Sequence, residues 1–233
     1  MKRHRSVTLG IIPSLLFCIG TLDILPQAQA EDLYLTGNLG WPSALKQDFE
    51  IGIIDGEVRS NPGGIAVSGA IGWTRDQLRV EAEFSVIETD FDQVNSKSAN
   101  ILGTTVNINL GTSLDGYTDT KNLMLNAWYD IKDPSIVGSD HRLFPFIGGG
   151  IGLSEVHMII NDIGGFFVNY DATDEVLAYQ VGAGIGYVLG KKASLNFSYR
   201  YFAANGLEFD NGIFAIDTSF SSHLFLIGML QEF

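Results

Sequence analysis

Two glycine-rich runs are the first candidates for chemistry in this sequence. The run FIGGGIGLS spans residues 146–154, and the run VGAGIGYVLG spans residues 181–190. A dinucleotide-binding fingerprint places G-x-G-x-x-G between a strand and a helix, so that backbone N–H groups surround the phosphates. Neither run is followed by a helical pattern. We therefore expect no bound nucleotide and no cofactor.

Paired acids and histidines are the next candidates. Glu81 and Glu83 could act as an acid and base pair, and Ser221 would share a strand face with His223 because side chains two apart on a strand point the same way. A nucleophilic triad also needs an acid that orients the histidine, and no acid is identifiable in that position. We therefore expect that the protein is not an enzyme.

Two acidic segments have the composition of a cation site. They are ETDFDQ at 88–93 and NYDATDE at 169–175. Both lack the fixed spacing of oxygen ligands and the turn glycine of an EF-hand loop. We expect solvated acidic loops here and no metal site.

The elements that must position these residues are β-strands, because hydrophobicity alternates with a period of two. In ASLNFSYRYF, residues 193–202, one face is apolar and aromatic and the other is polar. In LRVEAEFSV, residues 78–86, one face carries Arg79, Glu81 and Glu83. Three charges on one strand face are incompatible with an apolar core on that side.

Eight such stretches predict an all-β, eight-stranded antiparallel up-and-down transmembrane β-barrel. Several are 9 to 12 residues long, which agrees with the length of about 9–11 residues that a tilted membrane strand needs. Short and long connections alternate, as they do in outer-membrane barrels with short periplasmic turns and long surface loops. The eight predicted strands are 33–41, 64–74, 78–86, 121–131, 143–155, 175–189, 193–202 and 222–233, and the four predicted long loops are 42–63, 87–120, 156–174 and 203–221.

The N-terminus has the pattern of a cleaved secretory signal peptide. Three basic residues precede an apolar stretch at 7–22, and Ala28-Gln29-Ala30 forms an A-x-A cleavage site. The predicted signal is 1–30, and the predicted barrel domain is 31–233. The only cysteine, Cys18, falls within the signal, so the mature domain can form no disulfide.

Charge excludes nucleic acid as a partner. The signal takes one acid and three bases, which leaves 26 acids and 11 bases in 31–233. The two predicted ends of the barrel also differ in charge, because the predicted long loops hold 14 acids and only three bases. Basic residues gather instead at the short connections: Arg75, Lys132, Arg142, Lys191 and Lys192.

Alternation assigns the polar strand faces and the glycines to the barrel interior. An eight-stranded barrel is just wide enough for side chains to fill it. We predict an interior polar network, which would act either as a structural plug or as a narrow ion path; its members are Arg79, Glu81, Glu83, Asn126, Asp130, Gln180, Asn196 and Arg200. Two interior glycine tracks are predicted beside it, leaving space for Trp128, Arg79 or Arg200; the tracks are Gly148, Gly150 and Gly152, and Gly182, Gly184 and Gly186.

Three segments and the C-terminus resemble the opacity-protein and surface-antigen group of outer-membrane β-barrels. The segments are NLMLNAWYDI at 122–131, FPFIGGGIGLS at 144–154 and AYQVGAGIGYVLGKKASLNFSYRYF at 178–202, and the chain ends at Phe233. These barrels are similar in plan to the transmembrane domain of outer-membrane protein A. The resemblance implies that the barrel assembly machinery recognises the last strand through Phe233, although Gln231 stands where an apolar residue is typical.

The expected function is that of a bacterial outer-membrane surface protein. Apolar side chains would face the membrane lipid, and the acidic extracellular loops would serve a structural role or bind a host or cell-surface ligand. One alternative is a soluble periplasmic or secreted barrel that holds a small hydrophobic ligand, with the apolar face turned inward. Another is a small porin.

Overall fold

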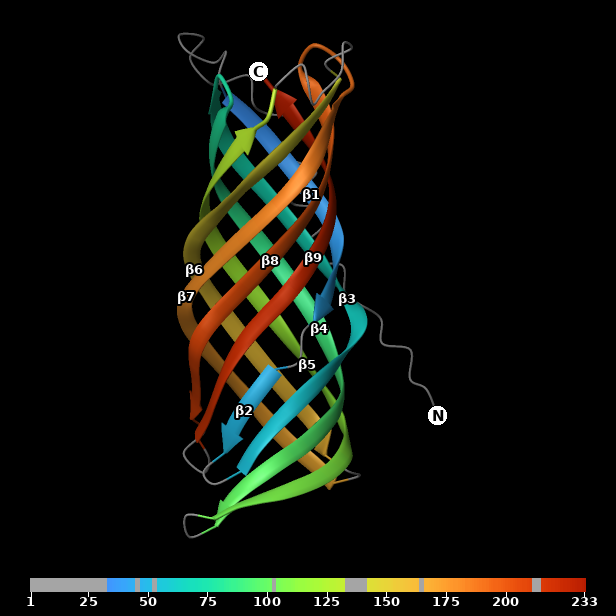
Figure 1. Ribbon diagram of the computed structural model, residues 1–233, viewed down its shortest axis with the longest axis vertical. Coiled ribbons are helices and arrows are strands. Elements are labelled where there is room, and N and C mark those ends of the chain that lie inside the picture. The colour runs from blue at the N-terminus through green and yellow to red at the C-terminus, as the bar shows by residue number, and fades with distance from the viewer. Residues whose placement is uncertain are drawn as a thin grey trace. The chain divides into compact units, whose positions relative to one another are not determined.

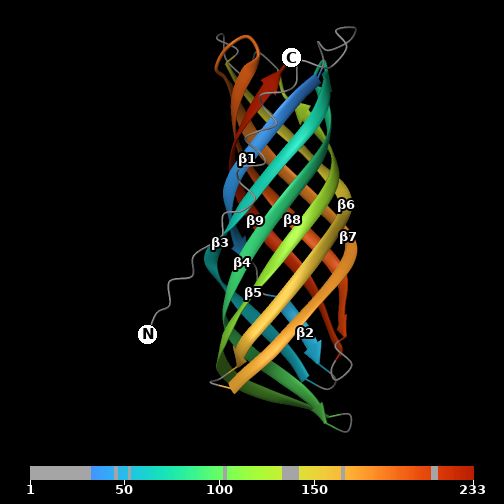
Figure 2. The same cartoon turned by 180° about the vertical axis from the view of Figure 1, so that it is seen from behind.

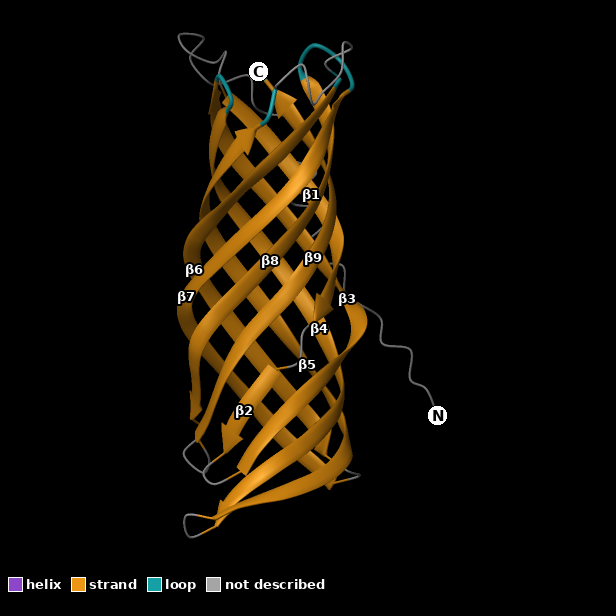
Figure 3. Ribbon diagram, in the orientation of Figure 1, coloured by secondary structure: helices purple, strands orange, loops and turns teal. Residues whose placement is uncertain are grey.

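The structure is a computed structural model that describes the backbone of residues 33–44, 47–51, 54–101, 104–132, 142–163, 166–210 and 215–233. Side chains are described for 33–43, 63–90, 115–132, 142–162, 171–207 and 219–233. The predicted signal peptide, 1–30, lies outside these ranges. Strands make up almost all of the described chain, as the orange ribbons of Figure 3 show.

The strands form a closed antiparallel barrel (Figures 1 and 2). Each of β3 to β9 pairs with its neighbours in chain order, and β1 closes the barrel by pairing with both β3 and β9. The strands are β1 (Leu33–Ala44), β2 (Gln47–Ile51), β3 (Ile54–Arg75), β4 (Leu78–Ile101), β5 (Thr104–Asp130), β6 (Leu143–Ile163), β7 (Phe166–Val188), β8 (Ala193–Asp210) and β9 (Ala215–Glu232).

Nine described strands occupy eight positions in the wall. β2 pairs with the same two strands as β1, with β3 through Gln47 to Ile51 and with β9 through Phe49 and Glu50. β1 and β2 therefore occupy one strand position of the barrel wall. The predicted eight-stranded up-and-down barrel is confirmed.

Side chains alternate strictly between the two sides of the wall. Along β5 from Lys121 to Asp130, every odd residue is exposed and every even residue is buried. The exposed side chains are predominantly apolar, with Leu177 76% and Ile151 71% exposed, whereas Glu83 is 1% exposed. The soluble-barrel alternative required the reverse arrangement and is wrong.

The four ranges predicted as long loops are mostly strand. The β4–β5 hairpin continues in antiparallel pairing to Ile101 and Thr104, inside the range 87–120. Strand pairing also runs through much of 42–63, 156–174 and 203–221. The sequence interpretation limited strands to the length of a membrane crossing, but antiparallel partners continue the ladder wherever both chains stay extended.

Short connections join β3 to β4 and β7 to β8 at the opposite end of the barrel, where the C-terminus lies (Figure 1). Asp76 and Gln77 form the turn between β3 and β4, and Asp76 has a φ of 58°. Aspartate tolerates this left-handed conformation better than most residues. Lys132 Nζ donates to the Asp76 carbonyl at 2.7 Å.

The described residues contain no helix long and apolar enough to cross a membrane.

Candidate functional site

The barrel interior contains a polar network centred on an ion pair between β4 and β8. Arg200 Nη1 donates to Glu83 Oε2 at 2.7 Å, and both side chains are almost fully buried. Gln180 Nε2 donates to the other Glu83 oxygen at 3.1 Å, and Ser68 Oγ donates to Oε2 at 3.3 Å. Both oxygens of Glu83 are therefore bonded, as a buried carboxylate requires.

Glu81 lies in the same network without a cation bonded to it. Its Oε1 accepts from Trp128 Nε1 at 2.8 Å and from Asn126 Nδ2 at 3.1 Å. Its Oε2 accepts from Tyr34 Oη at 2.8 Å. Three neutral donors from β1 and β5 thus stabilise a carboxylate that is 3% exposed. Gln180 Nε2 links this half to the other by donating to Asn126 Oδ1 at 2.7 Å.

A second ion pair lies toward the end of the barrel with the short connections, which we call the short-turn end. Arg79 Nε donates to Asp130 Oδ1 at 3.0 Å, and Nη2 lies 2.9 Å from the same oxygen. A cavity of about 450 Å³ opens at this end, and its lining includes Asp130, Phe144 and the three lysines Lys132, Lys191 and Lys192.

Aromatic rings cover both guanidinium groups. Arg200 Cζ lies 4.8 Å from the centre of the Trp128 ring, and Arg79 Cζ lies 5.0 Å from the Phe146 ring. A cation is attracted to the face of an aromatic ring, most strongly in a site without water.

All eight residues predicted for the interior network lie inside the barrel. Seven take part in the hydrogen bonds just described. Asn196 is 5% exposed, and its Oδ1 has no hydrogen-bond partner among the described residues. The structure adds members that the sequence interpretation did not include, namely Tyr34, Asn38, Ser68 and Trp128.

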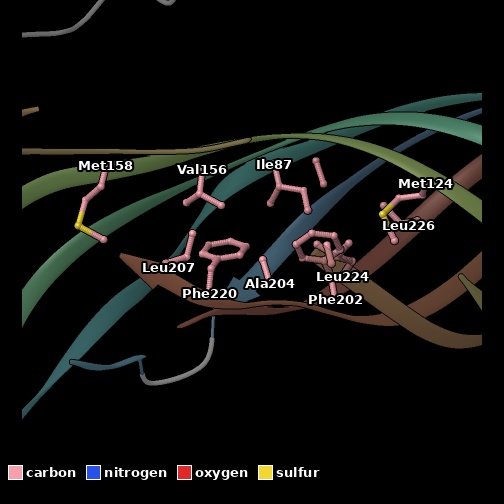
Figure 4. Close-up of a cluster of buried hydrophobic side chains, with 12 residues drawn as sticks. Ile87, Met124, Val156, Met158, Phe202, Ala204, Leu207, Phe220, Leu224 and Leu226 are labelled. Carbon is pink, nitrogen blue, oxygen red and sulfur yellow. The ribbon is translucent and has the colours of Figure 1, made fainter. Parts of the chain in front are cut away.

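A hydrophobic cluster lies in the interior toward the end of the barrel that carries the long hairpins, which we call the long-strand end (Figure 4). Phe202 and Phe220 meet edge to face with ring centres 6.1 Å apart. The cluster consists of Ala66, Ile87, Met124, Val156, Met158, Ala178, Phe202, Ala204, Leu207, Phe220, Leu224 and Leu226. Its β9 members Leu224 and Leu226 were missed because Phe225 and Ile227 on the other face are also apolar, so alternation does not mark the interior face there.

The glycine tracks lie on the inner face, where larger neighbours use the space. A Cβ on Gly148 would lie 2.7 Å from Trp128 Cε3, and a Cβ on Gly182 would lie 2.9 Å from Arg200 Cγ. The neighbours of the other four positions are Asn126 at Gly150, Met124 at Gly152, Phe146 at Gly184 and Phe144 at Gly186. Arg79, which the sequence interpretation named as a group needing space, is not among the nearest atoms at any of the six.

Buried side chains occupy much of the described interior. The network carries two guanidinium groups and three carboxylates, and both guanidinium groups are paired with a carboxylate, although Arg200 Nε and Asn196 Oδ1 have no hydrogen-bond partner among the described residues. The hydrophobic cluster lies in the other part of the described interior. Among the described residues, no group of three or more histidine, cysteine or acidic side chains could hold a metal ion.

An apolar belt surrounds the outside of the barrel. The belt consists of Leu39, Trp41, Ile65, Ile71, Val80, Phe84, Leu123, Leu125, Ile147, Ile151, Leu153, Leu177, Val181, Ile185, Phe197, Phe225, Ile227 and Met229. Strands with an outward apolar band and an inward polar face are typical of barrels that cross an outer membrane.

Charged side chains begin where this belt ends. Next to Leu123 and Leu153, Lys121 Nζ contacts Glu155 Oε1 at 2.6 Å, and this hydrogen bond raises the pKa of Lys121. Burial, together with the neighbouring charges of Asp119 and Asp90, raises the pKa of Glu88. Burial also raises the pKa of Asp119, an effect that His157 and Lys121 oppose.

The C-terminal strand carries the predicted assembly signal on the lipid side. Phe233 is 36% exposed, and its backbone N–H donates to the Leu33 carbonyl at 3.0 Å. On the same strand, His223 Nδ1 lies 2.5 Å from Tyr199 Oη, and its ring stacks on that of Tyr199. The described contacts of His223 are thus aromatic, and none of them joins it to Ser221.

Comparison with known proteins identifies the architecture. Residues 14–221 match a family model described as an outer membrane protein beta-barrel domain. The crystal structure of Neisserial surface protein A aligns with a TM-score of 0.50 and 13% identity, covering 86% of this chain and 97% of that chain. OprG from Pseudomonas aeruginosa aligns with a TM-score of 0.44 and 16% identity, covering 88% and 96%. The N-terminal barrel of OprF from the same organism gives 0.42 and 11%, covering 88% and 100%. No curated protein matches the chain.

Proposed function

The chain belongs to the outer-membrane β-barrel family, and from this we propose that it is a non-enzymatic surface protein that displays its long-strand hairpins outside the cell. The observation that carries the proposal is the contrast between the two regions of the barrel. The interior is filled by the ion pairs of Glu83 and Asp130 and by the hydrophobic cluster. The hairpins at one end continue well past the apolar belt.

A filled interior favours a structural or adhesive role over transport. Small molecules that crossed the barrel would have to displace both buried ion pairs, and breaking such a pair costs about 3–5 kcal/mol. Extended hairpins, in contrast, offer a large surface beyond the membrane. We propose that this surface contacts other cells or a host surface, and that the barrel itself anchors it in lipid.

The charges and the lengths of the connections support this orientation. Short turns are typical of the periplasmic end of outer-membrane barrels, and long hairpins are typical of the extracellular end. The short-turn end carries Lys191, Lys192 and the C-terminus. The proposed extracellular end carries most of the acids.

Attachment of cells tests the adhesive role. Three hairpins are cut back and closed with two-residue turns, by removing 94–112, 161–169 and 206–218. We expect the shortened barrel to remain heat-modifiable on SDS gels and to fractionate with outer membranes, while the cells lose attachment to a surface that the parent strain binds. Unchanged attachment would remove the adhesive role and leave a structural one.

Conductance in planar bilayers tests the closed interior. The purified barrel should show no stable conductance steps. Steps in well-folded protein would favour the small-porin alternative over the role proposed here.

A further inference from the structure

One strand edge at the long-strand end has no partner in the described chain. β5 pairs with β6 only from Leu114, which lies opposite Ile163, the last residue of β6. Residues 104–113 of β5 continue beyond this point and pair on the other side with β4, from Gln93 to Ile101. One side of this ten-residue stretch therefore leaves its backbone N–H and C=O groups without a strand neighbour among the described residues.

This free edge belongs to a small sheet whose β4–β5 hairpin extends past the other hairpins. We call it the tip sheet; it comprises residues 47–51, 54–59, 93–101 and 104–113 of β2, β3, β4 and β5. The end of the β4–β5 hairpin lies beyond the ends of the neighbouring hairpins in both Figures 1 and 2. The free edge is thus at the part of the barrel farthest from the short turns.

The edge lacks two of the usual devices that prevent strand addition, charged side chains and proline. Natural edge strands are protected by charged side chains, prolines or covering segments. The sequence TTVNINLGTS at 104–113 contains no charged residue and no proline. Its pairing with β4 has one irregularity, between Ser96 and Ser98, opposite Asn107 to Leu110. This irregularity divides the pairing of this stretch with β4 into two short ladders.

The charge of the tip sheet indicates what kind of strand would bind. The other three strands of the tip sheet carry four acids and two bases. The acids are Asp48, Glu50, Asp55 and Glu57, and the bases are Arg59 and Lys97. A second copy of this chain would bring the same excess of acids to the edge. A segment that carries lysine or arginine would not be repelled, and complementary charge would increase its rate of association.

We propose that the β5 edge at 104–113 binds an extended, basic segment of another protein as an added β-strand. The inference rests on the proposed function, since it names the class of partner for the displayed hairpins. Backbone hydrogen bonds would supply affinity, as they do wherever a peptide extends a sheet. The acidic sheet would select partners by charge.

The test uses the purified full barrel in detergent micelles and a fluorescent peptide. The probe alternates threonine and valine over about ten residues, the length of the edge, and carries a lysine at each end. One control peptide has proline at alternate positions, and another has glutamate in place of lysine. The variant protein lacks 94–112, and its matched control lacks 161–169 of the β6–β7 hairpin.

The expected result is saturable binding of the lysine peptide to the parent barrel and to the 161–169 deletion, with no binding to the 94–112 deletion. The proline peptide should not bind, and the glutamate peptide should bind about tenfold more weakly, a difference of about 1.4 kcal/mol. Amides of 104–113 should exchange more slowly with solvent when the peptide is bound. Equal binding to both deletions, binding of the proline peptide, or no binding at all would overturn the proposal.

Self-association of the parent barrel through 104–113 would also overturn it, because the occupant of the edge would then be a second copy. Failure of peptide binding is separable from failure of the proposed function. A barrel that mediates attachment of cells but does not bind the peptide would retain its role as a displayed surface protein and lose only the β5 edge as its contact.

Discussion

Glu83 and Arg200 are 117 residues apart in sequence, and they meet inside the barrel at 2.7 Å. The pair joins β4 to β8 across the interior, where both side chains are almost completely buried. Neither strand is a neighbour of the other in the wall. The contact therefore ties together parts of the barrel that no backbone ladder connects directly.

Removal of Arg200 should leave the Glu83 charge uncompensated. For Arg200→Met we expect a loss of about 3–5 kcal/mol in the free energy of unfolding, the cost of breaking a buried pair. The double variant Glu83→Gln with Arg200→Met should recover part of this loss, because neither charge remains buried alone. Urea unfolding in lipid vesicles measures each free energy. Equal losses in the single and double variants would show that the ion pair is not coupled.

The Tyr34 hydroxyl donates to Glu81 Oε2 at 2.8 Å, and Tyr34→Phe removes that donor alone. Since hydrogen bonds to charged groups contribute about 1.5–3 kcal/mol, we expect a loss of that size in the free energy of unfolding. Tyr129→Phe serves as the control, because Tyr129 lies on the outer face and is 49% exposed. If both variants unfolded at the same urea concentration as the parent, Tyr34 would contribute nothing to holding the carboxylate.

Leucine at Gly150 should impair folding. A Cβ there would overlap Asn126 Oδ1 and lie 2.5 Å from the Leu125 carbonyl oxygen, so the network would have to move. Gly37→Leu is the matched control, since Gly37 faces outward on β1 and a Cβ there meets nothing within 4 Å. The fraction of heat-modifiable protein on SDS gels measures folding. Normal folding of Gly150→Leu would refute the space-making role of the glycine track.

Glu88→Gln should stabilise the barrel at neutral pH. Burial and the charges of Asp119 and Asp90 raise the pKa of Glu88 in the folded state. The folded state therefore binds this proton more tightly than the unfolded state, and the ionised carboxylate opposes folding at any pH above the raised pKa. As the pH falls through that pKa toward the ordinary value of about 4, the penalty disappears.

The measurement is the urea midpoint of parent and Glu88→Gln at several pH values. The variant should have the higher midpoint at pH 7, with a difference that shrinks as the pH is lowered. Glu155→Gln is the control, because it removes the negative charge that Lys121 Nζ contacts at 2.6 Å and should not stabilise. A constant difference between parent and Glu88→Gln at all pH values would exclude titration as its cause.

The sequence was sufficient to predict the wall of the barrel, and the match to the outer-membrane family confirms the resemblance to this class. Alternation alone assigns Leu125 to the outside and Asn126 to the inside, because successive side chains of a strand point to opposite faces. The same rule places Arg200 on the inward face of β8. Closure then follows, since an open sheet edge cannot be satisfied in lipid.

The partners inside the barrel could not be predicted from alternation. Which residue of β8 lies level with Glu83 depends on the stagger of the strands around the barrel, and this stagger is a property of the whole closed sheet. The β9 residues of the hydrophobic cluster were missed for another reason. Leu224 and Leu226 face inward, while Phe225 and Ile227 face outward, so β9 shows no polar face to indicate the interior.

The length of the hairpins was also beyond the sequence interpretation. Residues such as Asn107 and Thr112 are polar and lie outside the apolar pattern, so they were interpreted as loop. Threonine is nevertheless favoured in strands, and the preference of such residues depends strongly on the pairing around them. Here the pairing of β4 with β5 keeps the chain extended up to Ile101 and Thr104.

Labelling of single cysteines on intact cells tests the topology of the barrel most directly. The only native cysteine, Cys18, falls in the predicted signal peptide. Asn100→Cys places a thiol near the end of the β4–β5 hairpin, and Lys191→Cys places one in the short connection between β7 and β8. A membrane-impermeant maleimide should label Asn100→Cys on intact cells and Lys191→Cys only after the outer membrane is permeabilised. Labelling of Lys191→Cys on intact cells, with Asn100→Cys protected, would contradict the display of the long hairpins outside the cell.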